Sequence, residues 1–173
     1  MSLPKDYQAP KSESKYLNKF EDGTTRIRVL SDFIIGWSYW VPNPDKPGSN
    51  KPVRVKEELM EVPAQALPDK YGHYVRHFWC GVIWNYKESK IQIMEITQKS
   101  IQDPIYNYEM DEDWGDVKSY DLKITRTKEN DKVKYEVTPA PKTELSMDIA
   151  NAFAEKNINL NALYDGKDPF GEN

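Results

Sequence analysis

Aromatic and cationic side chains are interleaved in two segments of this sequence. One segment runs from Tyr74 to Tyr86, and the other, Gly36-Trp37-Ser38-Tyr39-Trp40, places three rings within four residues. Flat rings stack on the π-faces of unpaired bases, and cations beside them pair with phosphates. These residue types predict a surface for single-stranded nucleic acid, and the residues expected to contact it are Arg28, Trp37, Tyr39, Trp40, Arg54, Lys56, Arg76, Trp79, Trp84, Lys90 and Lys123.

Each of these side chains also has an ordinary structural use. An aromatic ring at an alternating strand position fills the small core of a barrel as readily as it stacks on a base. Cations on an exposed strand face are commonly only solvated. In the segment 74–86, the alternation of side chains along a strand does not show which rings fill the core and which stack on bases, because both faces are partly apolar. Trp37, Tyr39 and Trp40 are the better stacking candidates, since they lie at the mouth of a long loop.

Charge is distributed unevenly along the 173 residues, whose net charge is -4. A uniformly acidic surface would repel phosphates. The acids, however, concentrate at 109–116 and near the C-terminus, whereas the cations named above lie mostly in the first two thirds of the chain. An acidic chain of this kind can still carry a basic groove.

Length and composition favour one soluble domain. No apolar run approaches the roughly 18 residues that a membrane span needs, and the polar N-terminus lacks the apolar segment of a signal peptide. Cys80 is the only cysteine, which excludes an intrachain disulfide and a thiolate metal cage. We therefore expect a cytoplasmic protein.

Hydrophobic alternation predicts five main strands, a long loop and two helices. The expected strands are 24–41, 74–86, 90–96, 119–126 and 133–137, with a short edge strand at 53–57 inside the Pro-rich loop 42–73. The expected helices are 98–108, capped by Thr97, and 144–156, capped by Thr143.

This element order is that of an OB-fold. The expected fold class is therefore mainly β, a five-stranded Greek-key barrel with a helix between strands three and four and a C-terminal helix. Residues 1–23 are expected to form a flexible arm, with Tyr16, Leu17 and Phe20 available to dock it. The barrel would span 24–141, and a helix with an acidic tail would span 142–173. In OB-folds, strands two and three and the loops corresponding to 42–73 and 127–132 bind oligonucleotides.

Several short motifs, in order along about residues 16–170, resemble the single-stranded DNA-binding proteins of tailed bacteriophages. They are Arg-Ile-Arg-Val-Leu-Ser-Asp with Gly-Trp-Ser-Tyr-Trp, His-Phe-Trp-Cys-Gly-Val-Ile-Trp-Asn-Tyr, Ile-Met-Glu-Ile-Thr-Gln-Lys-Ser-Ile, Asp-Trp-Gly-Asp with Tyr-Asp-Leu-Lys-Ile-Thr-Arg, and Leu-Tyr-Asp-Gly-Lys-Asp-Pro-Phe. The resemblance implies an OB-fold replication and recombination protein that coats single-stranded DNA in an infected bacterial cell. It also implies a protein that is not an enzyme.

The end of the chain is similar to the acidic tails by which bacterial single-strand binders recruit partner proteins. The residues that carry this similarity are Asp165, Asp168, Pro169 and Phe170, although Lys167 dilutes the charge and three residues follow the phenylalanine. Some phage proteins of this function hold zinc with three cysteines and a histidine, a set that this chain lacks. We expect no metal and no cofactor.

Two other classes of function remain open on the sequence alone. The aromatic patch would also serve a protein-interaction module that grips a polymerase, recombinase or helicase. The acidic run Glu109 to Asp116, with Asp121 beyond it, suits a Mg²⁺-dependent nuclease, although no histidine lies nearby to supply an acid or base. A metal site at His73, His77 and Cys80 is disfavoured, because strand alternation places Cys80 on the face opposite the two histidines.

Overall fold

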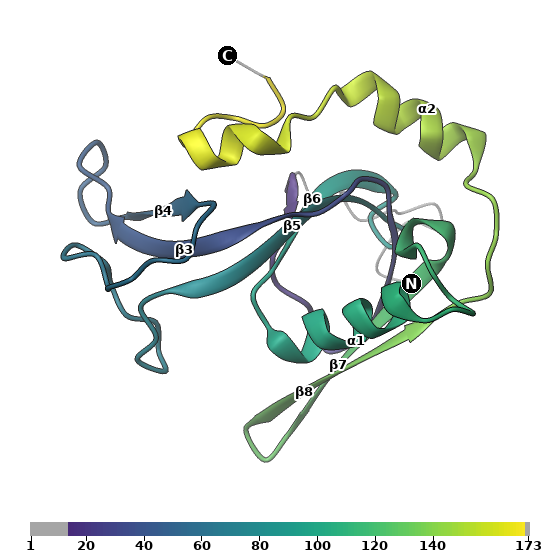
Figure 1. The fold of residues 1–173 in the computed structure, drawn as a ribbon, viewed down its shortest axis with the longest axis horizontal. Helices are drawn as coiled ribbons and strands as arrows, with labels where there is room; N and C mark the ends of the chain where they lie inside the picture. The colour runs from purple at the N-terminus through teal and green to yellow at the C-terminus, as the bar shows by residue number, and fades with distance from the viewer. Residues whose placement is uncertain (1–13, 172–173) are drawn as a thin grey trace, which may run out of the picture.

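The chain forms a mainly β structure in which one mixed sheet carries two α-helices (Figure 1). The computed structural model describes residues 14–171. The strands are β1 (Tyr16–Leu17), β2 (Gly23–Val29), β3 (Ile34–Pro42), β4 (Asn50–Val55), β5 (Arg76–Asn85), β6 (Lys90–Ile96), β7 (Asp121–Glu129) and β8 (Lys132–Pro139). The helices are α1 (Lys99–Met110) and α2 (Met147–Lys156), with 3-10 turns η1 (Val117–Ser119) and η2 (Leu160–Asp165).

The first predicted strand is broken into two, β2 and β3, and both pair antiparallel with β5. β2 pairs with the second half of β5, and β3 pairs with its first half. At the break, Phe33 lies directly over Gly81 of β5, where a Cβ would come within 2.6 Å of the phenylalanine ring. Because Gly81 has no side chain, Phe33 fits against β5 at the break, and β3 continues from β2 along the same partner strand.

Gly36 lies inside β3, next to β4. A Cβ there would meet the backbone oxygen of Val55, on β4, at 2.2 Å. The missing side chain allows the two strands to approach, and β3 and β4 then extend together beyond the body of the sheet as a ribbon (Figure 1).

The sheet is open. Its strand order is β1-β6-β5-β2-β7-β8, and β3 and β4 branch from β5. Among the described residues, β1 pairs only with β6 and β8 only with β7, so no ladder joins the two ends. The mainly β class is thus confirmed, whereas the closed barrel is not.

The start of the described chain packs against the sheet. Tyr16 and Leu17 form the strand that pairs parallel with β6, and Phe20 is buried in the core. Residues 1–13, which make up much of the expected flexible arm, lie outside the described residues.

Both expected helices are present with shifted starts. α1 begins at Lys99 after Gln98, which makes no side-chain cap, and contains Pro104. α2 begins at Met147, where the side chain of Ser146 accepts from the backbone N–H of Asp148. Within residues 14–171, neither helix combines the length and apolarity that a bilayer crossing requires.

Two apolar clusters cover opposite faces of the sheet. One lies between the sheet and α1 and includes Ile83, Met94 and Leu122. The other lies between β5, β6 and the C-terminal segment, where Phe78 and Ile93 pack near Leu163. The C-terminal segment therefore shields one sheet face (Figure 1).

Candidate nucleic-acid interface

A groove of about 1210 Å³ lies on the surface of the described part of the chain. The loop 67–75 and β3 form one side, and the first turns of α1 form another. Residues that follow β1 and residues of β7 and β8 complete the walls. The groove therefore lies where the two open ends of the sheet approach each other without pairing.

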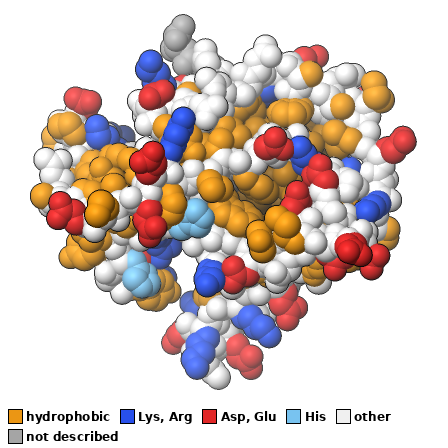
Figure 2. Space-filling model, in the orientation of Figure 1, with side chains coloured by type: hydrophobic (Ala, Val, Ile, Leu, Met, Phe, Trp, Pro, Cys, Tyr) orange, Lys and Arg blue, Asp and Glu red, His pale blue; other side chains and the backbone are white. Residues whose placement is uncertain are grey.

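Aromatic rings from five different parts of the chain converge on this groove. They are Trp40, Tyr71, Tyr74, Trp79, Tyr106 and Tyr135, accompanied by His73 and His77. Four of the rings expose between 43% and 66% of their residue surface: Trp40, Tyr71, Tyr74 and Tyr106. Large rings left uncovered by their own chain are available to a ligand. Figure 2 shows hydrophobic side chains gathered over the β3–β4 ribbon and the centre of the same view.

The lining of the groove carries more positive than negative charge. Its five cations are Lys19, Lys70, Arg76, Lys99 and Arg126, and its three acids are Asp69, Glu95 and Asp103. Three of these groups are paired: Arg76 with Asp69, Arg126 with Asp22, and Glu95 with Arg54. The groups that remain are three lysines and one aspartate. The whole chain has a net charge of -4, so the groove departs in sign from the molecule that surrounds it. A cationic, ring-lined channel is the arrangement by which proteins bind single strands.

The turn 69–73 holds two of the rings at the groove. Asp69 Oδ1 accepts the backbone N–H groups of Tyr71 (2.8 Å) and His73 (2.9 Å), and the other carboxylate oxygen pairs with Arg76 of β5. Burial alone would raise the pKa of Asp69, but the two backbone N–H groups and the guanidinium lower it to about 2. The carboxylate therefore stays charged and ties the turn to the sheet.

Three of the eleven predicted contact residues line the groove: Trp40, Arg76 and Trp79. Trp40 and Trp79 offer rings, while Arg76 also donates to Thr97 Oγ1 at 3.1 Å. The remaining eight lie elsewhere, for reasons that differ with their position in the sheet.

The predicted cluster of Trp37, Tyr39 and Trp40 is divided by strand alternation. Trp37 and Tyr39 point to one face of β3, and Trp40 points to the other. The Trp37 ring lies 4.9 Å from the ring of His77, its cross-strand neighbour, and is half-buried. Only Trp40 of this cluster faces the groove.

Arg28 is buried, which contradicts its predicted contact with phosphate. Its side chain is 3% exposed, donates to the backbone oxygens of Lys118 (2.8 Å) and Thr143 (2.7 Å), and pairs with Asp121. The arginine joins β2 to the segments before β7 and before α2. Its charge is already compensated inside the protein.

Arg54 is also committed to an internal partner. Two of its nitrogens lie 2.6 and 3.0 Å from Glu95 Oε2, and its side chain is only 13% exposed. Lys56 lies over the ring of Tyr164 in η2, 5.0 Å from the ring centroid. Neither residue lines the groove.

Trp84 packs against the covered face of the sheet rather than facing a ligand. It joins the cluster of Ile91, Ile93 and Leu160 beneath the C-terminal segment. Lys90 lies at the opposite end of the β5–β6 hairpin from Arg76, and nine residues of strand separate the two ends by about 30 Å. It does not line the groove. Lys123, on β7, also lies outside the groove.

The predicted partner-binding tail is folded onto the body. The Phe170 ring meets Tyr16 edge-on at 6.0 Å, and Lys15 Nζ lies 5.2 Å from its centroid. Pro169 is buried, and its carbonyl accepts from Asn159, while Asp165 and Asp168 are exposed. The aromatic residue of the tail is therefore already engaged by its own chain.

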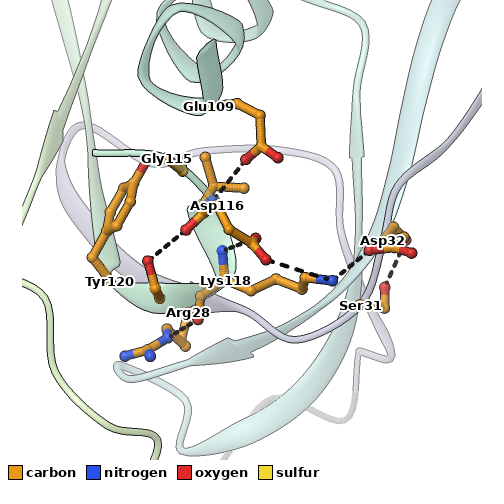
Figure 3. Close-up of polar contacts among 10 residues, drawn as sticks. Arg28, Ser31, Asp32, Glu109, Gly115, Asp116, Lys118 and Tyr120 are labelled. Atoms are coloured by element: carbon orange, nitrogen blue, oxygen red, sulfur yellow. Dashed lines mark hydrogen bonds and ion pairs between the residues drawn. The ribbon is translucent and has the colours of Figure 1, made fainter. Parts of the chain in front are cut away.

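The carboxylates of the acidic run 109–116, at and after the end of α1, accept backbone N–H groups and pair with a lysine. Glu109 accepts the N–H of Val117 at 2.7 Å, and Asp116 accepts the N–H of Lys118 at 2.9 Å. Figure 3 shows the ammonium of Lys118 lying between Asp116 and Asp32. Within residues 14–171 no three His, Cys, Asp or Glu side chains gather as a metal site.

The residues disfavoured as metal ligands are separated as strand alternation predicts. His77 Nδ1 lies 2.9 Å from the carbonyl of Gly36, whereas Cys80 is buried on the other face. Burial raises the pKa of the Cys80 thiol well above its ordinary value, so the sulfur stays protonated and unreactive.

Sequence reasoning missed most of the groove. Tyr71, Tyr106 and Tyr135 come from a loop, a helix and an edge strand, and the cations Lys19, Lys70, Lys99 and Arg126 are equally dispersed. The one usable signal was the length of the Pro-rich loop, because long loops are commonly functional. Comparisons with protein-family models, curated proteins and solved structures found no match to this chain.

Proposed function

We propose that this protein binds single-stranded DNA with little sequence preference and protects it during replication or recombination. The observation that carries the proposal is the groove, in which exposed rings and an excess of cations coincide within an acidic chain. The choice of DNA over RNA rests on the motifs that resemble phage single-strand binders, because stacking does not read the 2′-hydroxyl.

The order of elements supports an OB-like origin for the sheet. β2 with β3, then β5, β6, α1, β7 and β8 follow the order of an OB-fold, with the last closing ladder missing. The loop between β3 and β5 supplies Tyr71 and Tyr74, and residues beside the β7–β8 turn supply Val133 and Arg126. These correspond to the two loops that flank the ligand in OB-folds.

Ring stacking and phosphate contacts make different contributions to binding. Trp40, Tyr71 and Tyr106 present rings with open faces, and each base stacked on such a ring contributes about 1–3 kcal/mol. Every base has a π-face, so stacking does not select sequence. The cations contact phosphates and make affinity fall with salt through counterion release.

Tryptophan fluorescence tests the proposal directly. Trp40 and Trp79 line the groove, so titration with oligo-dT quenches emission and added salt reverses the quenching. Trp37→Phe is the matched control, because Trp37 lies on the same strand as Trp40 but does not line the groove. It leaves most of the quenching, whereas Trp40→Phe removes much of it. A flat titration at low salt contradicts the proposal.

A second pocket favours a second candidate function, the binding of a protein partner. It measures about 280 Å³, shares Trp79 and Tyr106 with the groove, and has an apolar lining that includes Phe33 and Ile35. Its rim carries the carboxylates Asp32, Glu109 and Asp116 against one cation, Lys118. Such a rim repels phosphate and suits an apolar side chain of a basic partner. Ile35→Asp, at a residue 51% exposed, would abolish partner binding and leave oligo-dT quenching intact.

A further inference from the structure

The carboxylate of Asp69 does two separate tasks with its two oxygens. Oδ1 accepts the backbone N–H groups of Tyr71 and His73 and so shapes the turn. Oδ2 pairs with the guanidinium of Arg76 and so neutralises a cation in the groove. One substitution, Asp69→Asn, can keep the first task, because an amide oxygen is also an acceptor, while it removes the second.

Arg76 has a second anchor that does not involve Asp69. One guanidinium nitrogen donates to Thr97 Oγ1 at 3.1 Å, at the end of β6. The side chain is about a third exposed and lines the groove beside Trp79 and His77. If the ion pair opens, the guanidinium therefore stays at the groove with two or more donors available.

A phosphate group offers Arg76 the same kind of partner that Asp69 offers. Both ligands present anionic oxygens, and a planar guanidinium binds either through charge-assisted hydrogen bonds. Asp69 loses the guanidinium in such an exchange but keeps its two backbone N–H donors, so the turn that carries Tyr71 is retained.

On this geometry, and resting on the proposed function, we propose that Asp69 is a built-in competitor for the phosphate of the bound strand. In the free protein its carboxylate occupies Arg76, and strand binding exchanges that carboxylate for a phosphate. The exchange tunes affinity without moving the ring-bearing turn.

The exchange has a signature in the salt dependence of binding. A phosphate that pairs with Arg76 releases a counterion from the strand, but the vacated Asp69 carboxylate takes up a cation from solution. The two effects offset each other in the unaltered protein. In Asp69→Asn only the release remains, so the slope of log affinity against log salt steepens by about 0.7.

The test is a double-mutant cycle with oligo-dT as the probe and tryptophan quenching as the readout. Asp69→Asn raises affinity about two- to fivefold at low salt, the scale of an exposed ion pair. The same substitution made in an Arg76→Gln background has no effect. Asp103→Asn is the matched control: Asp103 lines the same groove, is exposed, and makes no ion pair within the described residues, so it leaves the slope unchanged.

Each outcome decides between the two proposals. Equal gains from Asp69→Asn and Asp103→Asn, or a gain that persists in the Arg76→Gln background, overturn the exchange and leave DNA binding intact. A loss of affinity in Asp69→Asn also overturns it. If Asp69→Asn does not fold, Arg76→Gln alone decides, because exchange predicts an unchanged salt slope and a drop of about 0.7 contradicts it. Absence of quenching in the unaltered protein overturns the proposed function itself.

Discussion

The groove and the sheet face that the C-terminal segment covers contain similar residue types in different roles. Both are built on β5 and its neighbours, and both contain tryptophan, tyrosine and arginine. In the groove, Trp40 and Tyr71 keep about half or more of their surface exposed. On the covered face, Trp84 packs beneath the C-terminal segment. Arg54 is only 13% exposed and is paired with Glu95, which itself lines the groove.

Residue type therefore does not decide whether a side chain binds a ligand or packs in the core. The deciding factor is whether another segment of the chain covers that side chain. η2 and the segment after it cover β5 and β6 with Leu160 and Leu163, whereas no described segment covers Trp40 in the same way.

We expect the largest loss of stability when the buried carboxylate of Asp121 is removed. Asp121 is 3% exposed and receives Arg26, Arg28 and the hydroxyl of Tyr86. Asp121→Ala leaves a buried arginine without its counter-charge, which lowers the free energy of unfolding by about 3–5 kcal/mol. Urea denaturation measures this loss. Lys123→Ala, two residues along the same strand and half-exposed, changes stability by no more than about 0.5 kcal/mol.

A pair of tryptophan substitutions separates the two regions most directly. Trp84→Ala removes a packed ring and lowers the free energy of unfolding by about 3 kcal/mol, with DNA affinity of the folded protein unchanged. Trp40→Ala lowers oligo-dT affinity by about 1–3 kcal/mol with little change in stability. Thermal melts and fluorescence titrations of both variants provide the measurement. The contrast fails if each variant loses both properties equally.

Two lysines test the boundary of the groove with a smaller effect. Lys99 lines the groove and Lys123 does not. Lys99→Gln reduces the slope of log affinity against log salt by about 0.7, because one phosphate contact is lost, and Lys123→Gln leaves the slope unchanged. Titrations at four or more salt concentrations measure both slopes. A reduced slope in Lys123→Gln would place the strand on a different path.

We expect a smaller loss of stability at alkaline pH, where the hydroxyl of Tyr86 ionises. Burial first, and then the hydrogen bond to Asp121, raise the pKa of Tyr86 to about 12 from its ordinary value near 10. A raised folded-state pKa means that the stabilisation is complete below pH 10 and is lost as the pH rises toward 12. Tyr86→Phe therefore makes the free energy of unfolding less dependent on pH over that interval. Urea denaturation at stepped pH shows the difference, and an unchanged slope would contradict it.

The order of the elements was predictable because it depends on local pattern. Alternation in 119–126 and 133–137 located β7 and β8, and helical spacing located α1 and α2 to within a few residues. The long strand at 24–41 was wrong as a single strand, because Phe33 needs the space over Gly81, a contact between residues distant in the sequence. The open sheet was equally invisible, since closure depends on how two distant edges meet.

The sequence predicted the kind of candidate site, but only three of the eleven predicted contact residues line the groove. Local residue pattern was enough to predict that rings and cations suited to single strands lie in the β-rich first two thirds of the chain, and that a long Pro-rich loop interrupts them. Tertiary structure decided which of them face solvent. It buried Arg28 against Asp121, covered Trp84 with the C-terminal segment and opened a groove between unpaired sheet edges. Exposure is a property of which distant segments pack together, and no single stretch of residues encodes it.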